Sequence, residues 1–327
     1  MTFARRPLVV AVSLVIALAL VAVERPRADG QAAAGPDAST SLSRDGILLL
    51  AHGGSAEWDA EVRRVLEAVR VHHPAEVAFG MATRATIQAA ITALEAQGVE
   101  RIVAVPLFVS SHSSVIRATE YLLGLRDTAP PQLALFASMS HGEGGMTHGA
   151  SGAAGDDAHA AHGGADGTTP VVTTLRIQMT PALDQHPIVG EILRSRADAM
   201  SRSPEREAII VVAHGPSAAD DNARWLSDMA VLARQVESGG FGRVEYLTVR
   251  DDGDPSVKEA ATTELRDLVT GVRDAGLEPL IVPLLLSYGG IEEGIRERLE
   301  GLDYRMADQA LLPDERIAQW VLAVASS

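Results

Sequence analysis

Two histidines stand where their imidazole rings could do chemistry together. His52 follows the apolar run of GILLLAHGGS, and Gly53 and Gly54 let the backbone turn sharply directly after it. His112 lies in the serine-rich stretch that follows the apolar run of RIVAVPLFVSSHSS. Each run has the pattern of a strand buried on both faces, and ligands bind at the carboxyl ends of such strands. If the two strands are parallel neighbours, both imidazoles point into one crevice.

Imidazole side chains in this arrangement are suited to metal chemistry. A neutral imidazole is a ligand for divalent transition metals and also a base near neutral pH. Two histidines alone leave coordination positions open for a second molecule. A single histidine at a strand end is more often a loop residue satisfied by hydrogen bonds. The metal hypothesis therefore depends on the two occupying matching strand ends.

The elements that must position these histidines follow an alternating pattern. From residue 45 onward apolar strands alternate with amphipathic helices, which predicts a parallel sheet with helices on both faces. Val62, Val65, Leu66 and Val69, for example, recur at helical spacing behind the first strand. The first half is expected to contain strands at residues 47–51, 77–81, 102–105 and 171–179, and helices at 57–72, 86–97, 114–125 and 188–200.

The same unit then occurs a second time. AIIVVAHGPS in the second half matches ILLLAHGGS in the first, and PLIVPLLLSYGG matches RIVAVPLFVSSH. We therefore expect two tandem α/β units, residues 46–203 and 204–327, each a parallel four-stranded sheet flanked by helices.

The second unit lacks one of the two histidines. His214 keeps the position after the first strand, but Gly289 stands where the first unit has His112. Glu292 and Glu293 follow in the first turn of the next expected helix and could replace the missing ligand. We expect the first unit to carry the chemistry and the second to form a wall of the cleft.

Residues 138–169 form a Gly- and Ala-rich insert in the first unit. Its low apolar content predicts a disordered loop that does not pack. The histidines in this insert favour a role in auxiliary metal capture, in which their neutral imidazoles bind metal ions. The alternative interpretation is that the insert is a solvated low-complexity linker. The four histidines are His141, His148, His159 and His162.

The amino terminus has the pattern of an export signal. Arg5 and Arg6 precede an uncharged apolar run that ends at Val23. The length of this run lies between that of a signal-peptide core and that of a membrane span, so residues 1–23 are expected to be a cleaved signal peptide or a retained anchor. Residues 24–45 are expected to be a disordered linker. Both alternatives place the two units in the periplasm, and the second adds a membrane tether.

Composition excludes several classes of protein. The formal net charge of −15 argues against a nucleic-acid partner, because a phosphate backbone requires a basic face. The chain has no cysteine, which excludes disulfides, zinc–thiolate sites and iron–sulfur clusters. Neither the nucleophile elbow of α/β-hydrolases nor a dinucleotide or P-loop glycine pattern is present. We expect no organic cofactor, and a metal held by histidine and oxygen ligands.

With LLLAHGGS, the VPLFVSSHSSVIRA stretch and the tandem repeat together, the sequence resembles the CbiX/SirB group of class II tetrapyrrole chelatases after residue 45. The resemblance implies flavodoxin-like units and a lyase-type chelatase that inserts divalent cobalt, iron or nickel into a sirohydrochlorin-type tetrapyrrole, as in cobalamin biosynthesis. It also implies that His52 and His112 bind the incoming metal, which is a substrate. Arg84 and Arg117 are expected to meet the carboxylates of the tetrapyrrole.

The expected export supports a rival hypothesis. Tetrapyrrole precursors are made in the cytosol, so an exported chelatase needs an exported substrate or a different task. The rival is an exported metal-binding or metal-delivery protein on a degenerate chelatase fold. Metal insertion into sirohydrochlorin by the purified protein would separate the two.

Overall fold

The computed structural model of the chain describes residues 45–139 and 166–327. The expected export segment, the expected linker up to residue 44 and the four histidines of the insert lie outside the described residues. All described residues belong to one compact unit, Leu42–Ser327. None of the described helices has the length and hydropathy needed to cross a membrane.

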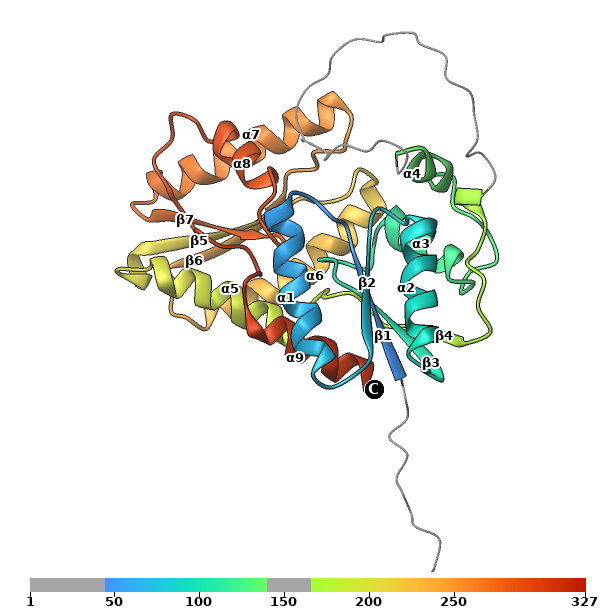
Figure 1. Ribbon diagram of the computed structural model, residues 1–327. Helices are drawn as coiled ribbons and strands as arrows, with labels where there is room; N and C mark the ends of the chain where they lie inside the picture. The colour runs from blue at the N-terminus through green and yellow to red at the C-terminus, as the bar shows by residue number, and fades with distance from the viewer. Residues whose placement is uncertain (1–44, 140–165) are drawn as a thin grey trace, which may run out of the picture. The chain divides into compact units, whose positions relative to one another are not determined.

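The first sheet contains four parallel strands in the order β2-β1-β3-β4 (Figure 1). These strands are β1 (Asp45–Ala51), β2 (Ala75–Phe79), β3 (Arg101–Pro106) and β4 (Arg176–Met179). The helices of this half are α1 (Ala56–Arg70), α2 (Arg84–Ala96), α3 (Ser114–Leu122), α4 (Leu133–Met139) and α5 (Pro187–Met200).

The second sheet repeats this order as β6-β5-β7-β8, again with parallel strands. Its strands are β5 (Glu207–Ala213), β6 (Arg243–Thr248), β7 (Glu278–Leu284) and β8 (Arg305–Met306). Its helices are α6 (Ala219–Glu237), α7 (Pro255–Asp274), α8 (Ile291–Arg298) and α9 (Glu315–Ala325). The prediction of two tandem α/β units, each with a parallel four-stranded sheet, is confirmed.

Two elements are shorter than the sequence predicts. β4 begins only at Arg176, because the backbone N–H of Val172 donates to the Gln88 side chain and not to a neighbouring strand. α3 ends at Leu122, because Gly124 adopts a left-handed conformation with a φ of 72° that terminates the helix.

The apolar strands divide their side chains between two cores. Successive residues of a strand point to opposite faces of the sheet. Ile47 and Leu49 of β1 therefore join a core shared by both sheets, and Leu48 and Leu50 join a core under α2 and α3. The same alternation in β5 separates the shared core from a third core under α7 and α8.

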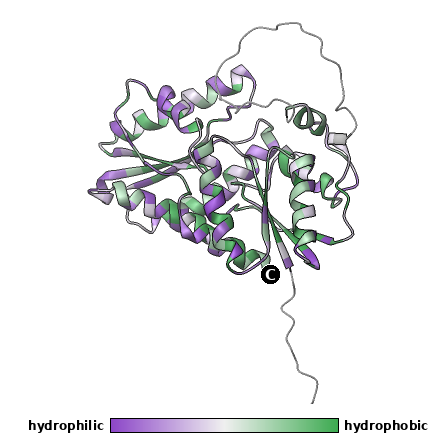
Figure 2. Cartoon of the chain, in the orientation of Figure 1, coloured by the Kyte–Doolittle hydropathy of each residue, from purple (hydrophilic) through white to green (hydrophobic). Residues whose placement is uncertain are grey.

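The last helix of each half packs against the other half. α5 contacts α6 and β7 of the second half, and α9 contacts α1 and β3 of the first. Helices α1, α5, α6 and α9 thus contribute to one core together with both sheets (Figure 1). The residues of α9 are mainly hydrophobic, as this burial requires (Figure 2). The expected boundary after residue 203 separates the two sheets, but the packing of the helices crosses it.

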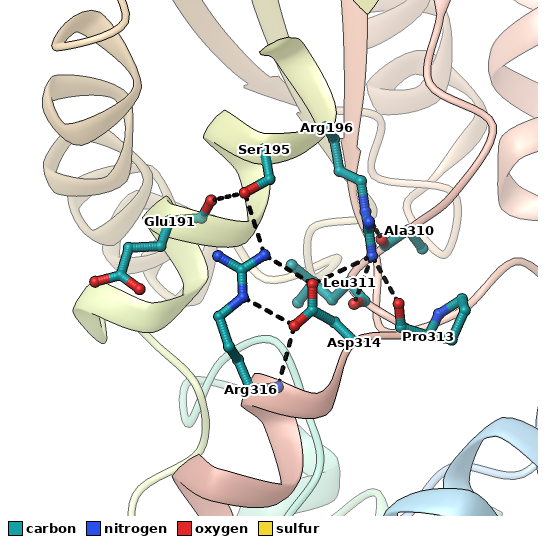
Figure 3. A network of polar contacts seen from close by, with 8 residues as sticks. All are labelled: Glu191, Ser195, Arg196, Ala310, Leu311, Pro313, Asp314 and Arg316. Carbon is teal, nitrogen blue, oxygen red and sulfur yellow. Dashed lines mark hydrogen bonds and ion pairs between the residues drawn. The ribbon is translucent and has the colours of Figure 1, made fainter. Parts of the chain in front are cut away.

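A polar network fixes α5 against the segment that precedes α9 (Figure 3). The Arg196 guanidinium of α5 donates hydrogen bonds to three carbonyl oxygens, those of Ala310 (2.9 Å), Leu311 (3.2 Å) and Pro313 (2.9 Å). Asp314, the N-cap residue of α9, lies 3.6 Å from the same guanidinium. Arg196 therefore joins α5 to the amino terminus of α9, the two helices that each pack against the opposite half.

Replacing Trp320 by alanine tests the shared core. Trp320 of α9 is 1% exposed and lies among side chains from both sheets. Trp320→Ala should lower the free energy of unfolding by about 3–5 kcal/mol, because it leaves a large cavity. Both sheets should still unfold in one transition, measured by fluorescence and circular dichroism in urea.

Gln319→Ala, at the exposed neighbour of Trp320, is the control and should change stability by less than about 0.5 kcal/mol. Unfolding of one sheet before the other would contradict the shared core.

Candidate functional site

The structure places His52 and His112 after neighbouring strands of the first sheet. His52 is the first residue after β1, and His112 lies in the loop between β3 and α3. β1 and β3 are parallel and adjacent, with Leu50 paired to Pro106 near their ends. Because parallel strands end at the same edge of a sheet, both histidines belong to its carboxyl edge. The predicted adjacency of the two strands is confirmed, and the facing of the two rings across one crevice stays a prediction.

The His52 ring is oriented by its own loop. Its Nδ1 lies 2.7 Å from the carbonyl oxygen of Gly53, and a carbonyl can only accept, so Nδ1 is the donor. Gly53 has a φ of 82°, a left-handed conformation that favours glycine. A neutral His52 therefore carries on Nε2 the lone pair that binds metals.

Serines and one aspartate hold the loop that carries His112. The Asp184 carboxylate accepts hydrogen bonds from the Ser111 N–H (2.6 Å) and the Ser111 hydroxyl (2.7 Å). The backbone N–H of His112 donates to the Ser110 hydroxyl at 3.1 Å. Ser113 caps the amino terminus of α3 with its side chain. The serine-rich sequence around His112 thus fixes its backbone by local hydrogen bonds.

The second half also reaches this loop, through one face of α6. Trp225 donates from Nε1 to the His112 carbonyl oxygen at 2.8 Å. Asp221 accepts two hydrogen bonds from the Arg117 guanidinium, at 3.0 and 2.8 Å. Asp228 Oδ2 lies 3.9 Å from His112 Nε2. Residues three and four apart on a helix lie on one face, so these three side chains form a single stripe.

Sequence reasoning missed this stripe. The signal was the spacing of Asp221, Trp225 and Asp228 along one helix face. Acidic residues at helical spacing usually form a solvated surface, and nothing in the local sequence says which element they face.

The two carboxylates of the stripe have different electrostatic environments. Hydrogen bonds from Arg117 lower the pKa of the Asp221 carboxyl, against an opposing effect of burial. Burial raises the pKa of the Asp228 carboxyl, the charge of Asp184 adds to this rise, and His112 opposes it. Asp228 Oδ2 is buried without a hydrogen-bond partner among the described residues.

The corresponding edge of the second sheet has different contacts. Asp252 Oδ2 lies 3.6 Å from His214 Nε2. Glu292 binds the loop before its own helix, where Oε2 accepts from the Gly289 N–H at 3.0 Å. Glu293 forms an ion pair with the arginine three residues later. Sequence reasoning missed Asp252, although a carboxylate directly after a strand, in VRDDGDP, was a usable signal.

Trp58 of α1 lies against Gly289. A Cβ atom at position 289 would stand 3.1 Å from Trp58 Cδ1, which is closer than ordinary van der Waals contact. An indole ring of the first half therefore lies beside the position of the second half that corresponds to His112.

Both arginines that were expected to bind substrate make contacts within the chain. Arg84 Nε donates to the Thr169 carbonyl oxygen at 3.0 Å, and Arg117 binds Asp221. Substrate binding by either arginine stays a prediction. Within residues 45–139 and 166–327, no group of three or more histidine, aspartate or glutamate side chains could hold a metal ion.

Substituting Asp221 tests the ion pair that joins the two halves. Asp221→Asn should lower stability near neutral pH by about 1.5–3 kcal/mol, because two charge-assisted hydrogen bonds are lost. The folded-state pKa of Asp221 is lowered, so its contribution is complete above the unfolded pKa of about 3.9 and is lost as the pH falls through the folded value. The difference in Tm from the wild type should therefore shrink below about pH 4.

Asp220→Asn is the matched control, since Asp220 is the exposed neighbour of Asp221 on α6. A difference in Tm between the wild type and Asp221→Asn that stays constant down to pH 2 would contradict the assigned ion pair.

Comparisons with known proteins agree with this architecture. Residues 46–200 match the sequence model of the CbiX family. Among curated proteins, a sequence comparison finds no match.

Solved structures share the fold at low sequence identity. SirB from Bacillus subtilis with Fe3+ is 16% identical with a TM-score of 0.55, and the match covers 86% of this chain and 94% of that one. The sirohydrochlorin chelatase SirB from Bacillus subtilis subspecies spizizenii, in complex with cobalt, is 14% identical with a TM-score of 0.52 and the same coverage.

DR2241 from Deinococcus radiodurans, a multi-domain protein with structural similarity to chelatases, is 17% identical with a TM-score of 0.49. The match covers 87% of this chain, which spans 55% of the length of DR2241. At these identities the two SirB structures establish the fold alone. Residues 46–200, a little under half of the chain, are similar to the CbiX family.

Proposed function

We propose that the protein is a metal chelatase that inserts a divalent ion, cobalt, iron or nickel, into a sirohydrochlorin-type tetrapyrrole. The observation that carries the proposal is the pair of histidines that follows two adjacent parallel strands, within the residues that match the CbiX family. The names of the two SirB structures, one with Fe3+ and one with cobalt, support metal binding by this fold. Export to the periplasm is part of the proposal and requires the tetrapyrrole to be present there.

The two imidazoles hold the metal loosely enough to release it. His52 offers Nε2, because its Nδ1 hydrogen is committed to the Gly53 carbonyl. His112 is the second ligand, on a loop fixed by local hydrogen bonds. Four protein ligands would fill a tetrahedral site, whereas two leave positions that the ring nitrogens can take. This ligand set suits transfer of the ion better than storage.

Metal insertion also requires removal of two pyrrole protons and binding of the substrate carboxylates. A neutral imidazole next to the ring is a suitable base, because its pKa lies near neutral pH. The amino terminus of α3 begins directly after His112, and helix amino termini attract carboxylates. Arg84 is the first residue of α2, and Arg117 lies in the first turn of α3. We assign the substrate carboxylates to this side of the sheet.

The second half, in this proposal, forms a wall of the cleft and not a second equivalent site. Trp58 lies against Gly289, and Glu292 binds the backbone of its own loop. Neither arrangement supplies a second imidazole to His214. The pair formed by His214 and Asp252 is the feature that a second metal position would use.

Single alanine substitutions test the assignment. His52→Ala and His112→Ala should each reduce the rate of Co2+ insertion into sirohydrochlorin by more than about 100-fold, since a ligand matters at least as much as the groups that orient it. Insertion is followed by the absorbance change of the tetrapyrrole. His214→Ala is the matched control, because His214 follows the equivalent strand of the second half, and it should retain activity.

Two results would overturn the proposal. Full activity of the double variant His52→Ala, His112→Ala would contradict the assignment of these two histidines to the site. Tight metal binding by the wild type without any insertion would favour the metal-delivery protein.

Removing residues 140–165 tests the role of the insert. α4 and the short 3-10 helix Asp166–Thr168 contact each other, so a brief linker can rejoin the chain there. We expect turnover at saturating metal to be unchanged and the metal concentration for half-maximal rate to rise, because the removed segment carries the four histidines. Loss of turnover at every metal concentration would show that the insert builds the site.

A further inference from the structure

Asp228 and Glu61 are the two carboxylates among the described residues with a buried oxygen that has no hydrogen-bond partner, and of these Asp228 lies beside His112. The Asp228 side chain is 13% exposed, and the buried oxygen is Oδ2. That oxygen lies 3.9 Å from His112 Nε2, across the boundary between the two halves. Burying a carboxylate oxygen without a partner is unfavourable, so the position of Asp228 beside an imidazole requires an explanation.

The helix that carries Asp228 is firmly held on the His112 loop. Trp225, three residues earlier, donates to the His112 carbonyl oxygen at 2.8 Å. Asp221, one turn further back, is bound by both terminal nitrogens of Arg117 in α3. The position of Asp228 relative to the imidazole is therefore determined by two contacts that do not involve Asp228 itself.

The other half contains an internal comparison. The buried residues Trp58, Val62, Val65, Leu66 and Val69 of α1 have the same spacing as Trp225, Met229, Leu232, Ala233 and Val236 of α6. In this alignment Trp58 corresponds to Trp225, and Glu61 corresponds to Asp228.

The two carboxylates have different partners. Glu61 is 19% exposed and forms an ion pair with Arg64, one turn along its own helix. On α6 the position that corresponds to Arg64 holds Val231, which cannot pair with a carboxylate. Glu61 thus has a cation on its own helix, whereas Asp228 lies beside the imidazole of His112 in the other half.

We propose that Asp228 is a positioning residue for His112. Its carboxylate accepts a hydrogen bond from the His112 Nε2–H, and the ring therefore presents the Nδ1 lone pair to the incoming metal. A shift of about 1 Å brings the 3.9 Å contact into hydrogen-bond range. Carboxylates that accept from the second nitrogen of a metal-binding histidine fix its tautomer and ring orientation. The inference rests on the proposed function. It also makes the first-half site depend on a side chain of the second half.

The proposal predicts opposite effects on catalysis and on stability. Asp228→Asn should reduce kcat for metal insertion by about 10–100-fold with little change in the KM for the tetrapyrrole. The Tm should stay the same or rise, because a buried carboxylate without a partner has been removed. A structural role would instead lower the Tm together with activity. Asp228→Glu, which keeps the acceptor, should recover part of the rate.

The tautomer of His112 gives a readout that needs neither metal nor turnover. Long-range 1H–15N NMR of the metal-free full chain should show His112 protonated on Nε2 in the wild type. Asp228→Asn should lose this preference, because an amide can offer a donor as well as an acceptor. Val231→Arg should have the same effect with the carboxylate still present, since it supplies the cation that Glu61 has in α1.

Glu61→Gln is the matched control and should leave the His112 tautomer and kcat unchanged. An unchanged tautomer in both Asp228→Asn and Val231→Arg would overturn the inference, whatever their activity. A tautomer change in a protein without chelatase activity would support the inference and reject the proposed function, so the two failures are distinguishable.

Discussion

The constraint on which this structure depends is the burial of two sheets against one layer of helices. α1, α5, α6 and α9 contribute side chains to a core that includes the inner faces of both sheets. A sheet whose strands are apolar on both sides must be packed against helices on both faces. Here the inner faces of the two sheets pack against the same layer of helices. Because α5 and α9 each pack on the opposite half, neither sheet is covered on its inner face by its own sequence alone.

The first helix of each half, α1 or α6, also contacts the other half through a tryptophan. In each half the tryptophan of the first helix meets the loop after the third strand of the other half. Trp225 donates a hydrogen bond to the backbone of His112, and Trp58 lies against Gly289. The same architectural contact thus adjoins a histidine in one half and a glycine in the other.

Two buried carboxylates show how structural and functional groups differ in this fold. The Glu207 side chain is 1% exposed and accepts hydrogen bonds from the Ser201 hydroxyl, the Arg202 N–H and the Arg305 guanidinium. Although burial by itself would raise its pKa, these hydrogen bonds lower it on balance. The buried Oδ2 of Asp228 has no such partner among the described residues. Glu207 is thus satisfied within the fold, whereas the buried oxygen of Asp228 lies beside an imidazole of the other half.

The amino-acid sequence alone predicts the local elements, the two similar α/β units and the sheet edge that carries His52 and His112. These follow from apolar runs of strand length, helical periodicity and turn residues, which act over a few neighbouring residues. Only the tertiary structure decided that α5 and α9 exchange halves, that Trp58 lies against Gly289 and that Asp228 lies beside His112. These contacts join residues from separate elements of the chain, and Trp58 and Gly289, like Asp228 and His112, are more than a hundred positions apart. An acidic helix face has the same pattern whether it meets water or an imidazole. Which of the two it meets depends on how the helices pack around the shared core.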